Sequence, residues 1–227
     1  DPGATLADDV TVGPWSWIGP DVEIGPGTII EPHVVIRGPT RIGANNHIYQ
    51  FSSVGEATPD LKYRDEPTRL LIGDNNVIRE NVTIHRGTVQ DRAETIIGDN
   101  NLLMAYVHIG HDSIIGNHTI LVNNAALAGH VHVGDWAILS GYTLVHQFCK
   151  IGAHAFSGMG TAIGKDVPAY ITVSGSPAEV ARKRPAAYFG PARVPTFSNQ
   201  VNLSTNSPQM MWPWNSDRSR SSSGRWL

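Results

Sequence analysis

The stretch IGDNNLLMAYVHIGHDSIIGNHTIL, residues 97–121, places a large aliphatic residue at every sixth position. The same spacing runs from Leu6 to Val54, resumes from Ile72 to Ile84 and continues to Ile163, with Ser157 as an exception. A period of six differs from the roughly 3.6 of an amphipathic helix and the roughly 2 of a simple strand. It is typical of a parallel β-helix in which three hexads make one coil of about 18 residues.

The residues around each aliphatic position agree with this fold. Glycine follows the aliphatic residue twelve times, as in Ile24-Gly25 and Ile151-Gly152. Asn-Asn pairs such as Asn45-Asn46 suit the corners, because asparagine tolerates the left-handed backbone conformation. Cys149 occupies an inward position that is usually small or β-branched, so we expect it in the core.

Composition excludes several other classes of protein. The chain has 227 residues, a net charge of −3 and one cysteine. No apolar run approaches the roughly 20 residues that cross a bilayer, so we expect no transmembrane segment. The charge gives no reason to expect nucleic acid as a partner. A single cysteine excludes an intrachain disulfide and is consistent with a reducing compartment.

Two polar segments interrupt the repeat. Residues 56–70, EATPDLKYRDEPTRL, replace about two hexads, and residues 85–95, HRGTVQDRAET, add several residues to one hexad. Stacked coils do not need such loops for stability. Loops with specific polar content are therefore candidates for function.

Stacking of the coils brings distant residues together, because positions about 18 apart lie one above another. This places Gly129 above His111 and His130 above Asp112. We expect one edge of the helix to carry His85, His108, His111, Asp112, His130, His146 and Gln147, with Asp60 and Lys62 reaching it from the first insertion.

This edge offers the groups that acyl transfer to a hydroxyl requires. Histidine ionises closest to neutral pH, so His111 suits a general base that Asp112 orients. Gly129 can bring a bare backbone N–H close to a reacting carbonyl. Lys62 and Arg86 suit the phosphates of an anionic substrate.

Two other classes of function stay open. Three histidines from adjacent coils could hold zinc with an open coordination position, as in a hexapeptide-repeat carbonic anhydrase. The chain could also be a non-catalytic scaffold or an inactive truncated remnant.

Several segments are more specific than the hexad itself. They are HIYQFSSVGEATPDLKYRDEPTRL (47–70), IRENVTIHRGTVQ (78–90), NLLMAYVHIGHDSIIGN (101–117), NNAALAGHVHVGD (123–135), LVHQFCKIGAHA (144–155) and DVPAY (166–170). Through them, residues 1–170 resemble the UDP-N-acetylglucosamine acyltransferases of lipid A biosynthesis.

The resemblance implies a left-handed β-helix and homotrimers with active sites between neighbouring subunits. It implies a cytoplasmic enzyme that transfers an R-3-hydroxyacyl chain from acyl carrier protein to the glucosamine 3-hydroxyl of UDP-N-acetylglucosamine, the first step of lipid A biosynthesis, with no cofactor. His111 matches the family's general base, Asp112 its orienting partner and Gly129 its oxyanion donor. The positions that match substrate-lining residues are Asp60, Lys62, His85, His108, His130, His146 and Gln147.

Met159 falls where the family's acyl groove ends, and a small residue there admits longer chains. We therefore expect Met159 to shorten the groove, so that the preferred acyl chain is short, with about ten carbons.

The resemblance ends near Ala178, where the family continues into a helical domain. The remaining sequence has five prolines, no sustained helical period and an end rich in serine and arginine. We therefore expect a β-helix acyltransferase domain over 1–170 and an irregular or disordered tail over 171–227.

Overall fold

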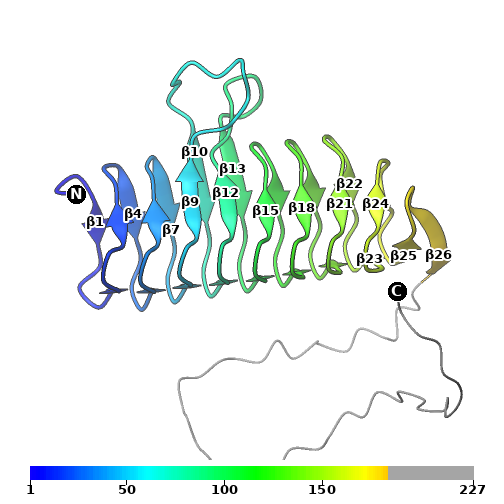
Figure 1. Ribbon diagram of the computed structural model, residues 1–227, viewed down its shortest axis with the longest axis horizontal. Coiled ribbons are helices and arrows are strands. Elements are labelled where there is room, and N and C mark those ends of the chain that lie inside the picture. Colours follow the sequence, from blue (N-terminus) through cyan, green and yellow to red (C-terminus); the bar gives the residue numbers. More distant parts are fainter. Residues whose placement is uncertain (184–227) are drawn as a thin grey trace, which may run out of the picture. The chain divides into compact units, whose positions relative to one another are not determined.

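Short strands separated by tight corners make up residues 1–183, the part of the chain that the computed structural model describes (Figure 1). The strands form three sheets, and each of the turns from β1 to β24 contributes one strand to each sheet. This is the expected left-handed parallel β-helix of hexapeptide repeats. Residues 184–227, which contain most of the tail expected to be irregular, lie outside the described residues.

The three sheets are named A, B and C. Sheet A contains β1 (Thr5–Leu6), β4 (Val22–Ile24), β7 (Thr40–Ile42), β10 (Arg69–Ile72), β13 (Glu94–Ile97), β16 (Ile114–Ile115), β19 (His132–Val133) and β22 (Lys150–Ile151). Sheet B contains β2 (Thr11–Val12), β5 (Ile29–Ile30), β8 (His47–Ile48), β11 (Val77–Ile78), β14 (Leu102–Leu103), β17 (Ile120–Leu121), β20 (Ile138–Leu139), β23 (Phe156–Ser157), β25 (Ile171–Ser174) and β26 (Glu179–Lys183). Sheet C contains β3 (Trp17–Ile18), β6 (Val35–Ile36), β9 (Ser53–Glu56), β12 (Thr83–His85), β15 (His108–Ile109), β18 (Ala126–Leu127), β21 (Leu144–Val145) and β24 (Ala162–Ile163).

The register between coils is fixed by backbone hydrogen bonds. Ile109 pairs with Leu127 in the next coil, 18 residues on. Where the second insertion intervenes, Ile84 pairs with Ile109, so the register skips the added residues. The stacking predicted from the sequence is therefore present on both sides of the insertion.

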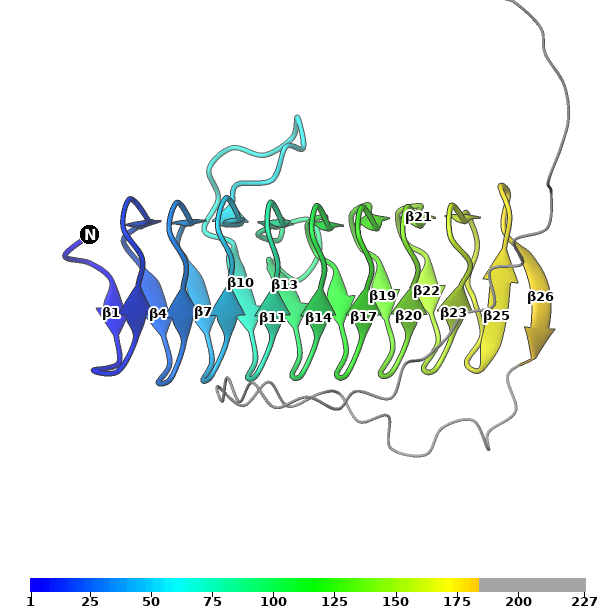
Figure 2. The same ribbon diagram turned by 60° about the horizontal axis from the view of Figure 1, so that its bottom comes forward.

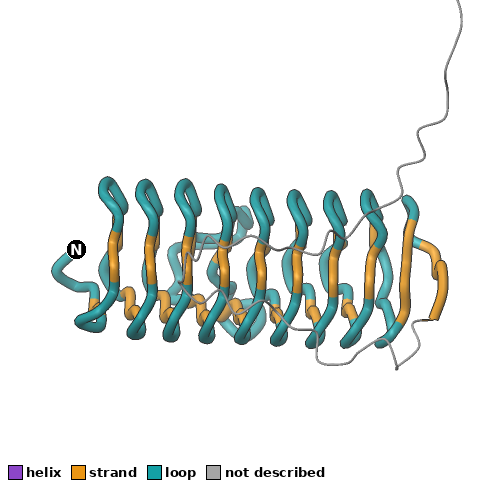
Figure 3. Tube along the Cα trace, turned by 90° about the horizontal axis from the view of Figure 1, so that it is seen from below, coloured by secondary structure: helices purple, strands orange, loops and turns teal. Residues whose placement is uncertain are grey.

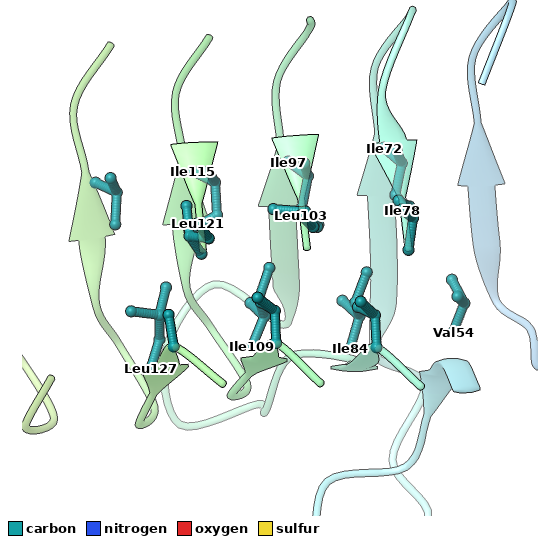
Figure 4. Close-up of a cluster of buried hydrophobic side chains, with 14 of the residues drawn as sticks. Val54, Ile72, Ile78, Ile84, Ile97, Leu103, Ile109, Ile115, Leu121 and Leu127 are labelled. Carbon is teal, nitrogen blue, oxygen red and sulfur yellow. The ribbon is translucent and has the colours of Figure 1, made fainter. Parts of the chain in front are cut away.

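The core consists of the aliphatic side chains at every sixth position. Figure 4 shows them in columns, with Val54, Ile84, Ile109 and Leu127 along sheet C. These four side chains are fully buried, and so is most of the rest of the core. Burying a side chain of this size contributes about 1.5–3 kcal/mol. Cys149 is buried among them, as the sequence predicts.

Three asparagine pairs, Asn45-Asn46, Asn75-Asn76 and Asn100-Asn101, play two roles at the corner between sheets A and B. The first member adopts the left-handed conformation, with φ of 56° at Asn75 and 58° at Asn100. The second member is buried, and its side-chain oxygen accepts a hydrogen bond from the backbone of the coil above. Asn101 N–H donates to Asn76 Oδ1 at 2.9 Å, and Asn76 N–H to Asn46 Oδ1 at 2.9 Å. The pairs therefore both turn the chain and tie successive coils together.

The two insertions project from the same edge of the helix (Figures 1 and 2). They join sheet C to sheet A, one between β9 and β10 and the other between β12 and β13. Hydrogen bonds connect them: His85 Nδ1 meets the carbonyl oxygen of Ala57 at 2.9 Å, and Arg86 Nη2 donates to the Tyr63 hydroxyl at 3.2 Å. Both loops therefore lie beside the predicted histidine edge.

The sheet runs past residue 170, where the sequence places the domain boundary. β25 pairs in parallel with β23, and β26 turns back to pair antiparallel with β25 (Figure 2); Figure 3 shows the same end of the helix as a tube. Thr172 and Val173 of β25 are buried, so β25 packs as the strand of a further coil would. The division into a 1–170 domain and a tail stays a prediction. The described residues include no helix of a length and apolarity that could cross a membrane.

Candidate active site

His111 and Asp112 occupy the corner between β15 and β16, where the chain passes from sheet C to sheet A. Asp112 takes the left-handed corner conformation, with φ of 58°. Its side chain is fully buried, whereas the His111 side chain keeps 17% of its surface exposed. The corner therefore presents an accessible imidazole on a buried carboxylate.

The two side chains are hydrogen-bonded, with His111 Nδ1 at 2.8 Å from Asp112 Oδ2. Thr88 adds three contacts from the second insertion. The Thr88 backbone N–H donates to Oδ1 and Oδ2 of Asp112, with N···O distances of 2.9 and 3.0 Å. The Thr88 hydroxyl donates to Asp112 Oδ2 at 2.7 Å. Burial raises the pKa of Asp112, but the hydrogen bonds from His111 and Thr88 outweigh it, and the pKa is lowered overall. Asp112 is therefore ionised at neutral pH.

An ionised carboxylate only accepts hydrogen bonds, so His111 Nδ1 must carry the proton in this pair. Neutral imidazole has one protonated nitrogen, which leaves Nε2 with a free lone pair. The site thus fixes one tautomer of His111 and makes Nε2 the proton acceptor.

Gly129 lies against this ring one coil above. A Cβ at Gly129 would stand 2.6 Å from both Cε1 and Nε2 of His111, so only glycine leaves room for the imidazole. Among residues 1–183, the Gly129 N–H has no hydrogen-bond acceptor. A free backbone donor therefore lies next to the proton-accepting nitrogen.

His130 completes the upper side of this corner. Its ring meets the His111 ring edge-on at 5.0 Å and stacks on Phe148 at 4.6 Å. His130 Nδ1 lies 3.0 Å from Asp91 in the second insertion, and Nε2 lies 3.9 Å from Asp112 Oδ2. The second insertion thus contacts His130 directly, through Asp91, and reaches His111 indirectly, through the Asp112 carboxylate.

His85 and His108 form a second pair, in which His108 belongs to the coil of the dyad and His85 to the coil below. Their rings meet at 5.3 Å, and His108 Nδ1 is hydrogen-bonded to the Thr83 hydroxyl at 2.8 Å. Burial lowers the pKa of His108, and the nearby His85 and His111 lower it further. His108 is therefore neutral at pH 7.

The remaining predicted residues lie farther from the dyad. His146 and Gln147 are exposed in the corner two coils above the dyad, and His146 Nδ1 contacts the Gln147 carbonyl at 3.1 Å. The described hydrogen bonds of Asp60 and Lys62 stay inside the first insertion, where Lys62 N–H donates to Asp60 Oδ1 at 2.9 Å. Met159 is 80% exposed at the corner before β24, on the opposite border of sheet C from His111.

Sequence reasoning missed Thr88, Asp91 and Phe148. Phe148 belongs to the corner column of Asp112 and His130, so the same stacking would have found it. Thr88 and Asp91 belong to an insertion, where the 18-residue spacing does not apply. Only the polar composition of that loop pointed to them.

One group of described residues could hold a metal ion: His111, Asp112 and His130 offer ligand atoms within 4.8 Å of one another. These atoms are already used in hydrogen bonds, because Asp112 Oδ2 accepts from Thr88 and His111. The group differs from the three-histidine zinc site considered from the sequence.

A family model described as bacterial transferase hexapeptide (six repeats) matches residues 3–38 and 94–129. A protein of Stutzerimonas stutzeri (strain A1501) named acyl-[acyl-carrier-protein]–UDP-N-acetylglucosamine O-acyltransferase is 82% identical over 179 residues. That match covers 79% of this chain and 69% of the relative. A protein of the same name from Pseudomonas putida (strain W619) is 80% identical over 179 residues, with the same coverage.

Solved structures agree with these sequence matches. LpxA from Acinetobacter baumannii superposes with a TM-score of 0.79 at 55% identity, covering 79% of this chain and 70% of that one. The UDP-N-acetylglucosamine O-acyltransferase of Moraxella catarrhalis gives a TM-score of 0.80 at 48% identity, covering 81% and 71%.

The buried position of His108 predicts a pH effect on stability. Its pKa is lowered from the ordinary 6.5, so the unfolded chain binds a proton more readily than the folded one. The free energy of unfolding should therefore fall as the pH drops from about 6.5 toward the folded-state pKa. Urea unfolding at several pH values should show a smaller fall for His108→Gln, and NMR titration should place the His108 midpoint below 6.5. A midpoint at or above that value would contradict the assignment.

Proposed function

Because the chain belongs to the acyl-[acyl-carrier-protein]–UDP-N-acetylglucosamine O-acyltransferase family, we propose that it uses the His111–Asp112 pair as the base of an acyl transfer. Acyl-[acyl-carrier-protein] and UDP-N-acetylglucosamine are its substrates, and the reaction is the first step of lipid A biosynthesis. The acyl group is an R-3-hydroxyacyl chain and the acceptor is the glucosamine 3-hydroxyl. The observation that carries the proposal is the fixed tautomer of His111 beside the free Gly129 N–H.

The first half of the reaction uses the dyad. His111 Nε2 takes the proton of the sugar hydroxyl as its oxygen attacks the thioester carbonyl carbon. Asp112 holds the Nδ1 proton and stabilises the imidazolium that forms. A tetrahedral intermediate results, with negative charge on the former carbonyl oxygen.

The second half uses the backbone donor and returns the proton. The Gly129 N–H is placed to donate to the oxyanion, which stabilises charge that is absent from the substrate. The intermediate collapses with cleavage of the carbon–sulfur bond, and the leaving thiolate takes the proton from His111 Nε2. The products are the ester and the free thiol of the carrier protein, and His111 is neutral again.

The residues around the dyad supply binding. In this proposal the substrates contact His85, His108 and His130 near the dyad. Farther out they contact His146 and Gln147, and Asp60 and Lys62 of the first insertion. A nucleotide diphosphate suits Lys62, whose exposed ammonium is a mobile point charge.

The outer face of sheet C suits an acyl chain. Its outward residues after His108 are Ala126, Leu144 and Ala162, and Leu144 is 55% exposed. This apolar row runs from the coil of the dyad toward the coil that carries Met159. We propose that the row is one wall of the acyl groove and that Met159 ends it.

Assembly into a homotrimer is the second part of this proposal. The outward side chains of sheet B are mostly apolar and only partly buried: Ile29, Val77, Leu102, Ile120, Ile138 and Phe156. Contact between copies of the chain would remove more of this surface from water. We also propose a cytoplasmic location, in line with the single, buried thiol of Cys149.

Replacing His111 by alanine should remove the base without disturbing the coil. We expect kcat to fall by about 10²- to 10⁴-fold, the usual contribution of a general base, with little change in KM for UDP-N-acetylglucosamine. Acyl transfer from R-3-hydroxyacyl carrier protein would be measured directly. His33→Ala is a control, since the His33 ring stacks on Trp15 and Phe51 at a corner between sheets B and C, in the N-terminal coils. Turnover by His111→Ala near that of the control would exclude His111 as the base.

Replacing Met159 by alanine should lengthen the groove. We expect the unmodified protein to prefer acyl chains of about ten carbons over about fourteen, because each misplaced methylene costs binding energy. The variant should raise the ratio of kcat/KM for the longer to the shorter chain by about tenfold or more. If the unmodified protein and Met159→Ala both strongly preferred the chain of about fourteen carbons, Met159 would not end the groove.

The assembly is checked by the mass in solution. We expect light scattering to give the mass of three chains at micromolar concentration, because the apolar row of sheet B favours association. A mass of one chain across that range would contradict the trimer.

A further inference from the structure

The second insertion is built to present Thr88 at a fixed place. The backbone oxygen of Thr88 accepts hydrogen bonds from Asp91 N–H at 3.3 Å and Ala93 N–H at 3.0 Å, which close the loop on itself. At Gly87, a Cβ would collide with the backbone of Ala93 and Glu94, so this close return of the chain requires glycine. Thr88 itself is only 2% exposed. The loop thus holds one buried threonine against the β-helix.

Thr88 supplies most of the hydrogen bonds that the Asp112 carboxylate receives. Oδ1 accepts from the Thr88 N–H, and Oδ2 accepts from the Thr88 N–H, the Thr88 hydroxyl and His111 Nδ1. His130 Nε2 is farther away, at 3.9 Å. The backbone of Asp112 is also held, since its N–H donates to the Thr95 hydroxyl at 2.8 Å. Without Thr88, His111 would be the one remaining hydrogen-bond donor to the carboxylate among the described residues.

A fully buried carboxylate is costly unless it is hydrogen-bonded in its ionised form. Thr88 provides those bonds from a direction that leaves the His111 side of Oδ2 unobstructed. The geometry of the carboxylate is therefore set by two elements, the corner that carries it and the loop that clamps it.

We propose that Thr88 is a positioning residue for the catalytic dyad: its hydroxyl and N–H fix the Asp112 carboxylate so that Oδ2 holds the Nδ1 proton of His111. The inference rests on the proposed function of the dyad. Through Asp112, Thr88 secures the tautomer that makes His111 Nε2 the base. The lowered pKa of Asp112 agrees with this arrangement.

The test compares Thr88→Val with Thr88→Ser. Valine has nearly the same shape but lacks the hydroxyl, whereas serine keeps it. Thr28→Val is a matched control, because Thr28 is equally buried and its hydroxyl donates to the Gly43 carbonyl, far along the chain from the dyad. All three variants would be assayed for acyl transfer beside the unmodified protein, and their unfolding would be followed in urea.

For Thr88→Val we expect kcat to fall by about 10- to 100-fold, the equivalent of one hydrogen bond to a charged group. KM for UDP-N-acetylglucosamine should change by less than about threefold, since Thr88 acts through Asp112 on the base. Thr88→Ser should restore most of kcat, and Thr28→Val should leave it unchanged. In ¹⁵N NMR spectra of His111, the signals of a single Nδ1-protonated tautomer should give way to a mixture in Thr88→Val only.

The outcomes separate this inference from the proposed function. If the unmodified protein transfers acyl groups, loses activity in His111→Ala and yet tolerates Thr88→Val without change in kcat or tautomer, the positioning role is wrong and the dyad stands. Equal losses of stability and activity in Thr88→Val and Thr28→Val would likewise reduce Thr88 to a structural residue. If a folded, unmodified protein shows no transfer at all, the proposed function itself fails. The NMR comparison still tests whether Thr88 fixes the tautomer.

Discussion

Backbone hydrogen bonding between successive coils is the constraint on which the rest of the structure depends. Each short strand pairs in parallel with the strand one coil away, as Ile109 does with Leu127. Parallel pairing fixes the register, so residues that recur at the coil length stack in columns. The aliphatic columns then fill the interior, and the corner residues form columns outside it (Figure 4). A change in register would therefore shift the aliphatic columns and the corner columns together.

The corner of the proposed active site is one of these columns. At the corner between sheets A and B, Asn75 and Asn100 serve to turn the chain. At the corner of His111, the coil above contributes Gly129, and the absence of a side chain there lets the ring pack against the backbone. The repeat thus places an imidazole and a backbone donor side by side, although they lie 18 positions apart in the sequence.

The insertions add what a repeat cannot supply. A coil offers each corner residue neighbours only above and below it, and that is too few donors for a buried charge. The second insertion brings Thr88 to Asp112 and Asp91 to His130 from the side. Because a buried ionised carboxylate needs several hydrogen bonds, the loop is part of the proposed active site.

From the sequence alone, the six-residue period determined the three-sheet β-helix, the buried position of Cys149 and the stacking of Gly129 on His111. These follow because parallel pairing turns a constant spacing into a constant position. The period carried no information inside residues 85–95, where the chain leaves the coil. Only the tertiary structure decided that Thr88 hydrogen-bonds to Asp112, and that the sheet continues through β25 and β26 beyond residue 170. The physical reason is that a loop takes its path from contacts with several coils, which no local spacing encodes.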